Sequence, residues 1–318
     1  MGAFRIDPLV RFIGLALLAV AAPLVAQAQD GRPTPSAAGC QLRIEPLRVR
    51  WEIGGYDPYG GDAPYATFEI AWSNDGTAAC AGDVEVRTDG EAYGMKPSGR
   101  PRALAALLLY SLVDDYSAAD LTPTGGVSQA RPGSTSLALE PGARTVRRYI
   151  LAVDVDRLQG DGLFEQSVRF GLRTRDNRLV TDKLVVLALQ VQPSAVMGLR
   201  GAFTRTDGGG RIELGELVEG GINLPLQVWI RSTGGYRVAV SSRNKGRLVL
   251  AQDASWSVPY RLILGSRPIN LGTGGQVESR RGTGLEEDAY DLRLVVGDTA
   301  RRRAGVYSDL IELTVAPI

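Results

Sequence analysis

The chain has 318 residues, with 36 Lys and Arg against 35 Asp and Glu, no His, 39 Gly and 17 Pro. A net charge of +1 provides no overall field that would attract nucleic acid or an anionic membrane. The absence of His excludes Ser-His-Asp and Cys-His catalysis and nearly all zinc and copper sites. An enzyme would have to work with carboxylates, Lys or Tyr. We expect no enzyme, no catalytic residue, no metal site and no cofactor.

The N-terminus has the pattern of a secretory signal peptide. Arg5 and Arg11 form a positive start, residues 12–20 are apolar, and Ala-Gln-Ala at 26–28 is a small-x-small cleavage site. This pattern predicts a signal peptide over residues 1–28, a mature start near Gln29, and export from the cytoplasm.

Two cysteines, Cys40 and Cys80, follow the signal. In an oxidising compartment the default expectation for such a pair is one disulfide. In the chain-entropy model the loop that it closes contributes about 4 kcal/mol to stability.

Short alternating segments bounded by turn residues predict that the mature chain is all-β. Residues 83–87 read Asp-Val-Glu-Val-Arg, residues 237–241 read Arg-Val-Ala-Val-Ser, and residues 292–294 read Leu-Arg-Leu. Several prolines interrupt any long helix.

One order of features occurs twice along the chain. The paired segments are Ile53-Gly54 with Leu214-Gly215, Phe68–Ile70 with Leu226–Val228, the strand after Cys80 with the strand after Gly235-Tyr236, Leu109–Leu112 with Pro259–Leu262, and Gly162–Phe170 with Gly305–Leu313. When the two copies are aligned with Phe164 on Tyr307, the residues expected to face the core coincide in both. A shift of one residue in this alignment would turn all of them outward. The repeat predicts two β-sandwich domains, residues 29–194 and 195–318, with a boundary near Pro193-Ser194.

The two copies differ after their closing strands. The first copy continues through a polar turn at 175–178 into a further strong strand at 183–192, whereas only Ala-Pro-Ile follows Val315 in the second. We expect the second sandwich to lack its final strand, and such an edge is usually covered by a strand from another chain. The predicted acceptor edge consists of Tyr307, Leu310, Ile311, Leu313 and Val315. Alternatively, residues 271–287 fill the gap from within the same chain.

The segments of the repeat resemble the spore coat protein U domain, the pilin-like domain of archaic, Csu-type chaperone–usher pili. The second copy carries the clearest match, because residues 304–315 look like the closing small-Gly-x-Tyr-x-Asp motif and its strand, and residues 259–262 look like the central Pro-Tyr-x-Leu strand. The first copy matches through residues 54–58, 109–115 and its cysteine pair. It departs from the motif at Phe164-Glu165-Gln166, and the second copy has no cysteines.

The resemblance implies two immunoglobulin-like β-sandwiches, the second incomplete, in a fimbrial subunit built by donor-strand complementation. It implies a periplasmic chaperone, an outer-membrane usher and a next subunit as partners, with a passage from the periplasm to the cell surface. Residues 29–39 are short, polar and interrupted by two prolines, so they make a poor donor strand. A chain that accepts a strand without giving one would be the tip adhesin.

For an adhesin, the candidate surface-binding loop contains Tyr56, Tyr59 and Tyr65 in a Gly- and Pro-rich segment. Exposed aromatic side chains on turns can bind apolar surfaces or sugars, and the alternative is that they cap the core. The competing interpretations of the whole chain are a secreted carbohydrate-binding or envelope structural protein with closed domains, and a hydrolase based on two carboxylates.

Overall fold

The computed structural model describes residues 39–98, 107–206, 209–279, 285 and 287–318. In this part of the chain every regular element is a β-strand, so the predicted all-β class is confirmed. No helix among these residues could cross a membrane. The predicted signal peptide, residues 1–28, lies outside the described residues and stays a prediction.

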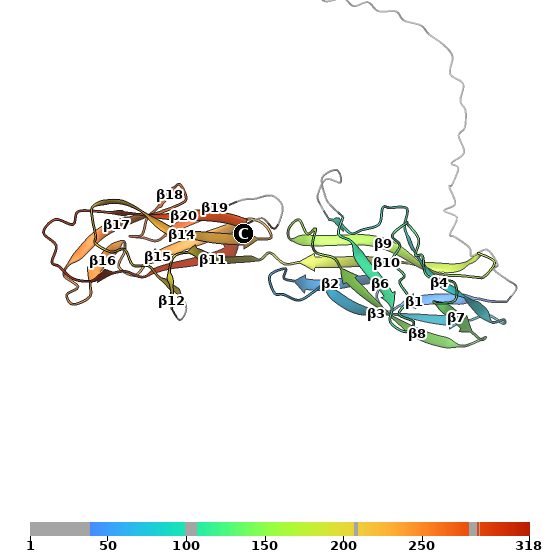
Figure 1. The fold of residues 1–318 in the computed structure, drawn as a ribbon. Helices are drawn as coiled ribbons and strands as arrows, with labels where there is room; N and C mark the ends of the chain where they lie inside the picture. Colours follow the sequence, from blue (N-terminus) through green and yellow to red (C-terminus); the bar gives the residue numbers. More distant parts are fainter. Residues whose placement is uncertain (1–38, 99–106, 207–208, 280–284, 286) are drawn as a thin grey trace, which may run out of the picture. The chain divides into compact units, whose positions relative to one another are not determined.

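The first sandwich is built from the strands that precede Pro193 (Figure 1). One sheet has the order β1-β3-β8-β6; the other has the order β2-β10-β9-β4-β7, and β5 pairs with β9. The strands are β1 (Leu42–Pro46), β2 (Arg50–Tyr56), β3 (Tyr65–Asn74), β4 (Cys80–Thr88), β5 (Lys96–Pro97), β6 (Tyr110–Asp114), β7 (Ser136–Leu139), β8 (Arg144–Val153), β9 (Gly162–Arg173) and β10 (Leu179–Val191).

Aromatic side chains from both sheets fill the first core. Trp51 on β2 stacks on Phe68 of β3, with ring centroids 5.0 Å apart. Phe170 on β9 lies 5.0 Å from Trp51 and 5.1 Å from Tyr149 of β8. Because these rings join the two inner faces, the stacking ties the sheets together beyond the area that it buries.

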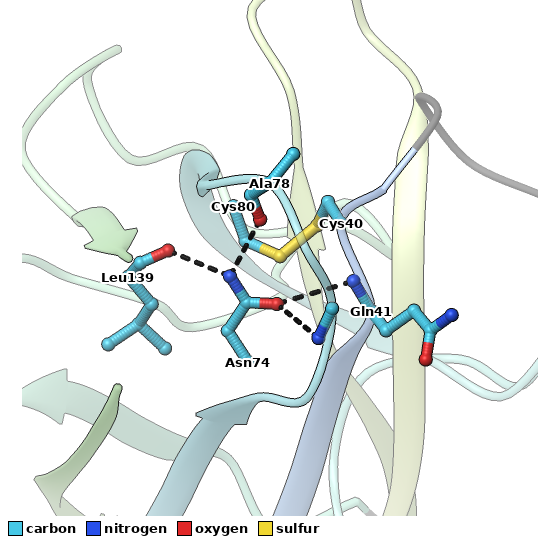
Figure 2. The surroundings of a disulfide bond; sticks show 7 residues. Cys40, Gln41, Asn74, Ala78, Cys80 and Leu139 are labelled. Carbon is cyan, nitrogen blue, oxygen red and sulfur yellow. Dashed lines mark hydrogen bonds between the residues drawn. A yellow bond between two sulfur atoms is a disulfide. The ribbon is translucent and has the colours of Figure 1, made fainter. Parts of the chain in front are cut away.

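The predicted disulfide is present at one end of this sandwich (Figure 2). Cys40 and Cys80 are joined, and Asn74, fully buried, lies beside the bond. The Asn74 carbonyl oxygen accepts from the amides of Gln41 and Gly76, and its amide group donates to the carbonyls of Ala78 and Leu139. The Asn74 side chain therefore joins the same segments that the disulfide joins.

The second sandwich is built from the strands that follow Pro193 (Figure 1). One sheet has the order β11-β14-β20-β17-β16-β21, with β18 paired to β17; a small sheet has the order β19-β15-β22, and β12 and β13 form a hairpin. The strands are β11 (Ala195–Gly201), β12 (Thr204–Thr206), β13 (Gly209–Arg211), β14 (Gly220–Ser232), β15 (Tyr236–Ser242), β16 (Arg247–Leu250), β17 (Ser257–Leu264), β18 (Arg267–Ile269), β19 (Gly275–Ser279), β20 (Glu287–Val296), β21 (Tyr307–Ser308) and β22 (Ile311–Pro317).

The strands of the predicted repeat occupy matching places in the two sandwiches. In the first, β4 pairs with β9 and places Val84 opposite Leu172; in the second, β15 pairs with β22 and places Val238 opposite Val315. Likewise β6 and β17, which contain the two Tyr-x-Leu segments, hold the fourth place in the orders β1-β3-β8-β6 and β11-β14-β20-β17-β16-β21. The predicted inward alignment of β9 with β22 thus agrees with the hydrogen-bonded register. The outer limits of the two domains stay predictions.

Candidate strand-accepting edge

The last strand of the second sandwich has a strand partner on one side only. β22 pairs antiparallel with β15, from Ser242 opposite Ile311 to Tyr236 opposite Pro317. The sheet order β19-β15-β22 places β22 at its edge, and none of the described residues pairs with its other side. We call this side of β22, with the inward side chains Ile311, Leu313 and Val315, the open edge.

The matching strand of the first sandwich is covered on both sides. β9 lies between β4 and β10, and β10 pairs with it antiparallel from Leu179 to Val191. The inward side chains of β10 are fully buried: Val185, Leu187, Leu189 and Val191. On the neighbouring strand β9, Val168 and Phe170 are also 0% exposed. In this sandwich the chain closes its own edge.

Equivalent side chains therefore differ in burial between the two sandwiches. Val168, Phe170 and Leu172 are all 0% exposed, whereas Ile311, Leu313 and Val315 pack against the second core but are only partly buried. Since apolar surface left in water costs free energy in proportion to its area, the open edge is an incomplete part of the core.

A second unpaired segment corresponds to β2, the other neighbour of β10. In the first sandwich β2 pairs, parallel, with β10 alone. Its counterpart, residues 211–217, carries partly buried Ile212 and Leu214, which pack against the second core as Trp51 and Ile53 do in the first. Beyond Arg211, which ends β13, none of these residues belongs to a strand.

An ion pair supports this equivalence. Arg50 and Glu52 are joined at 2.7 Å on the outer side of β2, and Arg211 and Glu213 are joined at 2.8 Å two residues apart in the same way. β2 and residues 211–217 thus share an outward Arg–Glu pair and inward apolar side chains. They differ because a strand, β10, pairs with β2, whereas no strand in the described part of the chain pairs with residues 212–217.

Asp309 fixes the start of β22. Its carboxylate accepts hydrogen bonds from the hydroxyls of Tyr260 (2.6 Å) and Ser242 (2.5 Å), and from the amides of Asn244 (3.0 Å) and Leu310 (2.7 Å). Burial, followed by the hydrogen bond to Asp309, raises the pKa of Tyr260, which keeps its hydroxyl protonated as a donor. Four donors from three segments therefore hold β22 in register while its outer side is unpaired.

Asp309 also marks a difference from the first copy. β9 runs without interruption from Gly162 to Arg173, but its counterpart divides into β21, which pairs with β16, and β22. The sequence motif contained the Asp, but the partners of its carboxylate on β15 and β17 could not be identified from spacing alone.

The other two residues of the predicted acceptor edge lie outside β22. Tyr307 is in β21, partly buried against the second core, and its hydroxyl donates to the carbonyl of Arg303 at 2.7 Å. Leu310 is 52% exposed, and in the alternation of side chains along this segment it faces outward with Glu312. The inward stripe of β22 itself therefore consists of Ile311, Leu313 and Val315.

The described part of residues 271–287 does not cover the open edge. Its strand β19 pairs with β15 from Tyr236 to Val240, on the side of β15 away from β22. Residues 280–284 and 286 lie outside the described part of the chain. Internal closure by β19 is thus excluded by its place in the sheet.

The predicted tyrosine loop lies at the end of the first sandwich where β10 ends. Tyr56 pairs with Val191 and packs against the first core. Tyr59 is partly buried, and burial raises the pKa of its phenol. Tyr65 is 68% exposed, at the start of β3. Of the three, Tyr65 alone presents most of its ring to solvent, so the structure does not gather them into one exposed patch.

Comparisons with known proteins give likenesses in structure only. No family model matches the sequence, so the resemblance to the spore coat protein U domain is not confirmed, and no curated protein matches either. Similar solved structures include a chaperone–tip adhesin complex of the Csu pili of Acinetobacter baumannii (11% identity, 86% of this chain and 99% of that chain, TM-score 0.44). The CupB6 tip adhesin of Pseudomonas aeruginosa (9%, 87% and 94%, 0.39) and the CfaE adhesive subunit of enterotoxigenic Escherichia coli (11%, 84% and 91%, 0.35) are also similar. TM-scores below 0.5 establish no shared function.

Proposed function

We propose that this chain is a subunit of a chaperone–usher pilus, and that a strand from another polypeptide completes its second sandwich. The observation that carries the proposal is the contrast between β9, which β10 covers, and β22, whose outer side is unpaired. A periplasmic chaperone would supply the strand first, and a neighbouring subunit would replace it at an outer-membrane usher.

The physical basis is the cost of an open edge. An unpaired strand exposes a row of N–H and C=O groups that can pair with any extended chain, which invites aggregation. A strand added from outside supplies main-chain hydrogen bonds, and its alternate side chains cover the apolar stripe. A secreted protein that must reach the cell surface in this state therefore needs a dedicated partner.

The position in the fibre follows from the other end of the mature chain. Residues 29–39 contain two prolines and no alternating apolar pattern, so this segment would serve poorly as a donor strand. We place the chain at the pilus tip, with the first sandwich as the adhesive domain for a surface receptor. The proposal includes export by the signal peptide at 1–28 and no enzymatic activity.

The test uses the chain's own closing strand. In a completed variant, a copy of residues 174–192 follows Ala316, because Ala316 corresponds to Arg173, the last residue of β9. The matched control carries Leu187→Ser and Leu189→Ser in the copy only, which removes two side chains that are 0% exposed in the first sandwich. Hydrogen–deuterium exchange is measured on the β22 peptide and on the peptide spanning 211–217.

We expect the completed variant to protect both peptides and the control to protect neither, because a strand inserted between them would pair with both. Equal exchange in the two variants would contradict strand acceptance. For the pilus itself, a photo-crosslinking amino acid at Leu313 is expected to capture the alternating N-terminal segment of another exported subunit. The same amino acid at Phe170 should give only intrachain links, because β10 covers β9 and the Phe170 ring packs against Trp51 and Tyr149.

A further inference from the structure

The strand that closes the first sandwich matches the charge of its neighbours. Asp182 on β10 points to the outer face, where it pairs with Arg87 of β4 at 2.7 Å and with Arg169 of β9 at 3.4 Å. Asp182 lies opposite Gly171, diagonal to Arg169. The completing strand thus carries an acid where the covered edge carries bases.

At the same two places the open edge of the second sandwich carries one acid and one uncharged residue. In the register that places Phe164 on Tyr307, Glu312 corresponds to Arg169, and Ser241, opposite Glu312, corresponds to Arg87. Glu312 is exposed, and its side chain forms no ion pair with the described residues. The basic pair of the first sandwich is therefore replaced by one acid.

The unpaired segment on the other side of the missing strand adds to this charge. Glu213, Glu216 and Glu219 are all exposed, and Arg211, paired with Glu213, is the one base between 211 and 219. A strand lying between this segment and β22 would have Glu312 on one side and, on the other, Glu213, which is paired with Arg211 as Glu52 is with Arg50.

We infer that the natural occupant of the open edge is an extended segment of another chain that carries Lys or Arg on its outward face, opposite Thr314 or Glu312. This inference rests on the proposed function and specifies its partner. The inward apolar alternation would supply affinity, whereas the outward base would select among strands with the same alternation, because like charges directly opposite on neighbouring strands are destabilising.

The same charge disfavours one wrong partner, namely β10 of a second copy. β10 has the required apolar alternation, but it would place Asp182 diagonal to Glu312. Exchange of identical elements between copies is a common route to unwanted dimers, and a repulsive contact at the rim of the edge discourages it.

The experiment compares two completed variants that differ in one residue. The first contains the unaltered copy of residues 174–192, and the second carries Asp182→Lys in that copy only. Exchange protection of the β22 peptide is measured at low and high salt. We expect the Lys variant to show about three- to tenfold higher protection at low salt, with the difference shrinking at high salt, where exposed charges are screened.

A reciprocal change isolates the contact. With Glu312→Lys the preference should reverse, so that the unaltered Asp copy protects better. Equal protection by both copies, or a preference that Glu312→Lys leaves in place, would overturn the charge inference while strand acceptance stands. Failure of both copies to protect β22 would instead count against strand acceptance itself.

Discussion

Truncation of one leucine in β9 and one in β22 measures how completely each sandwich buries its core. Leu172 on β9 is 0% exposed, and Leu313 on β22 is partly buried. A fully buried Leu→Ala change costs about 2–5 kcal/mol, from lost transfer free energy and the remaining cavity. We expect Leu172→Ala to cost about 3 kcal/mol in the first sandwich. We expect Leu313→Ala to cost only about 1 kcal/mol in the second, because solvent already reaches its side chain.

The difference should vanish when the open edge is filled. A strand beside β22 would bury Leu313 as β10 buries Phe170, which is 0% exposed. The cost of Leu313→Ala would then rise to about 3 kcal/mol, and the extra 2 kcal/mol or so would weaken strand acceptance about 30-fold. Hydrogen exchange of the β9 and β22 peptides in the full chain, with and without the appended copy of residues 174–192, reports the two sandwiches separately.

Leu310→Ala is the control, because Leu310 is 52% exposed and faces outward. It should change stability by no more than about 0.5 kcal/mol in either state. If Leu313→Ala costs the uncompleted chain as much as Leu172→Ala does, then the edge of the second sandwich is already closed and accepts no further strand.

Three further predictions concern single features. Cys40→Ala with Cys80→Ala should destabilise the first sandwich by about 4 kcal/mol in urea unfolding and leave the second unchanged; a shift in both would show coupling between them. Asp309→Ala should speed exchange in β22 at a cost of about 2 kcal/mol, since it leaves the buried Tyr260 and the partly buried Ser242 and Asn244 without their acceptor, while β9 keeps its protection. Because burial raises the pKa of Tyr260, its hydroxyl stabilises the folded state fully below the unfolded pKa near 10, and this stabilisation is lost as the pH rises further. In Tyr260→Phe the urea midpoint should therefore fall less steeply at alkaline pH than in the parent chain, and an identical pH profile would contradict this role.

The strands and their inward faces could be predicted from the sequence because both depend on local alternation. The repeat also predicted that Leu172 and Val315 are equivalent. The structure agrees, because Leu172 lies opposite Val84 of β4 and Val315 lies opposite Val238 of β15. A two-residue period fixes which side chains face the core, so the partly buried stripe at Ile311, Leu313 and Val315 was accessible to pattern reasoning.

Individual side-chain hydrogen bonds between residues distant in sequence could not be predicted. Asn74 reaches Leu139 across 65 residues, and Asp309 reaches Tyr260 across 49, with no pattern near either residue that indicates a partner. The tyrosine loop shows the same limit: composition marked it as a candidate surface, but the pairing of Tyr56 with Val191 determines at which end of the sandwich it lies.

The segment at 211–217 shows why one local pattern gives two outcomes. Arg50-Trp51-Glu52-Ile53 forms a strand, whereas Arg211-Ile212-Glu213-Leu214, with the same alternation and the same Arg–Glu ion pair, does not continue as one beyond Arg211. Strand structure requires a hydrogen-bonded neighbour, and β2 has that neighbour only in β10. In the proposed strand acceptance, the absence of strand at 212–214 and the partial exposure of Leu313 have one cause, and a single extended segment would pair with both residues 212–214 and β22.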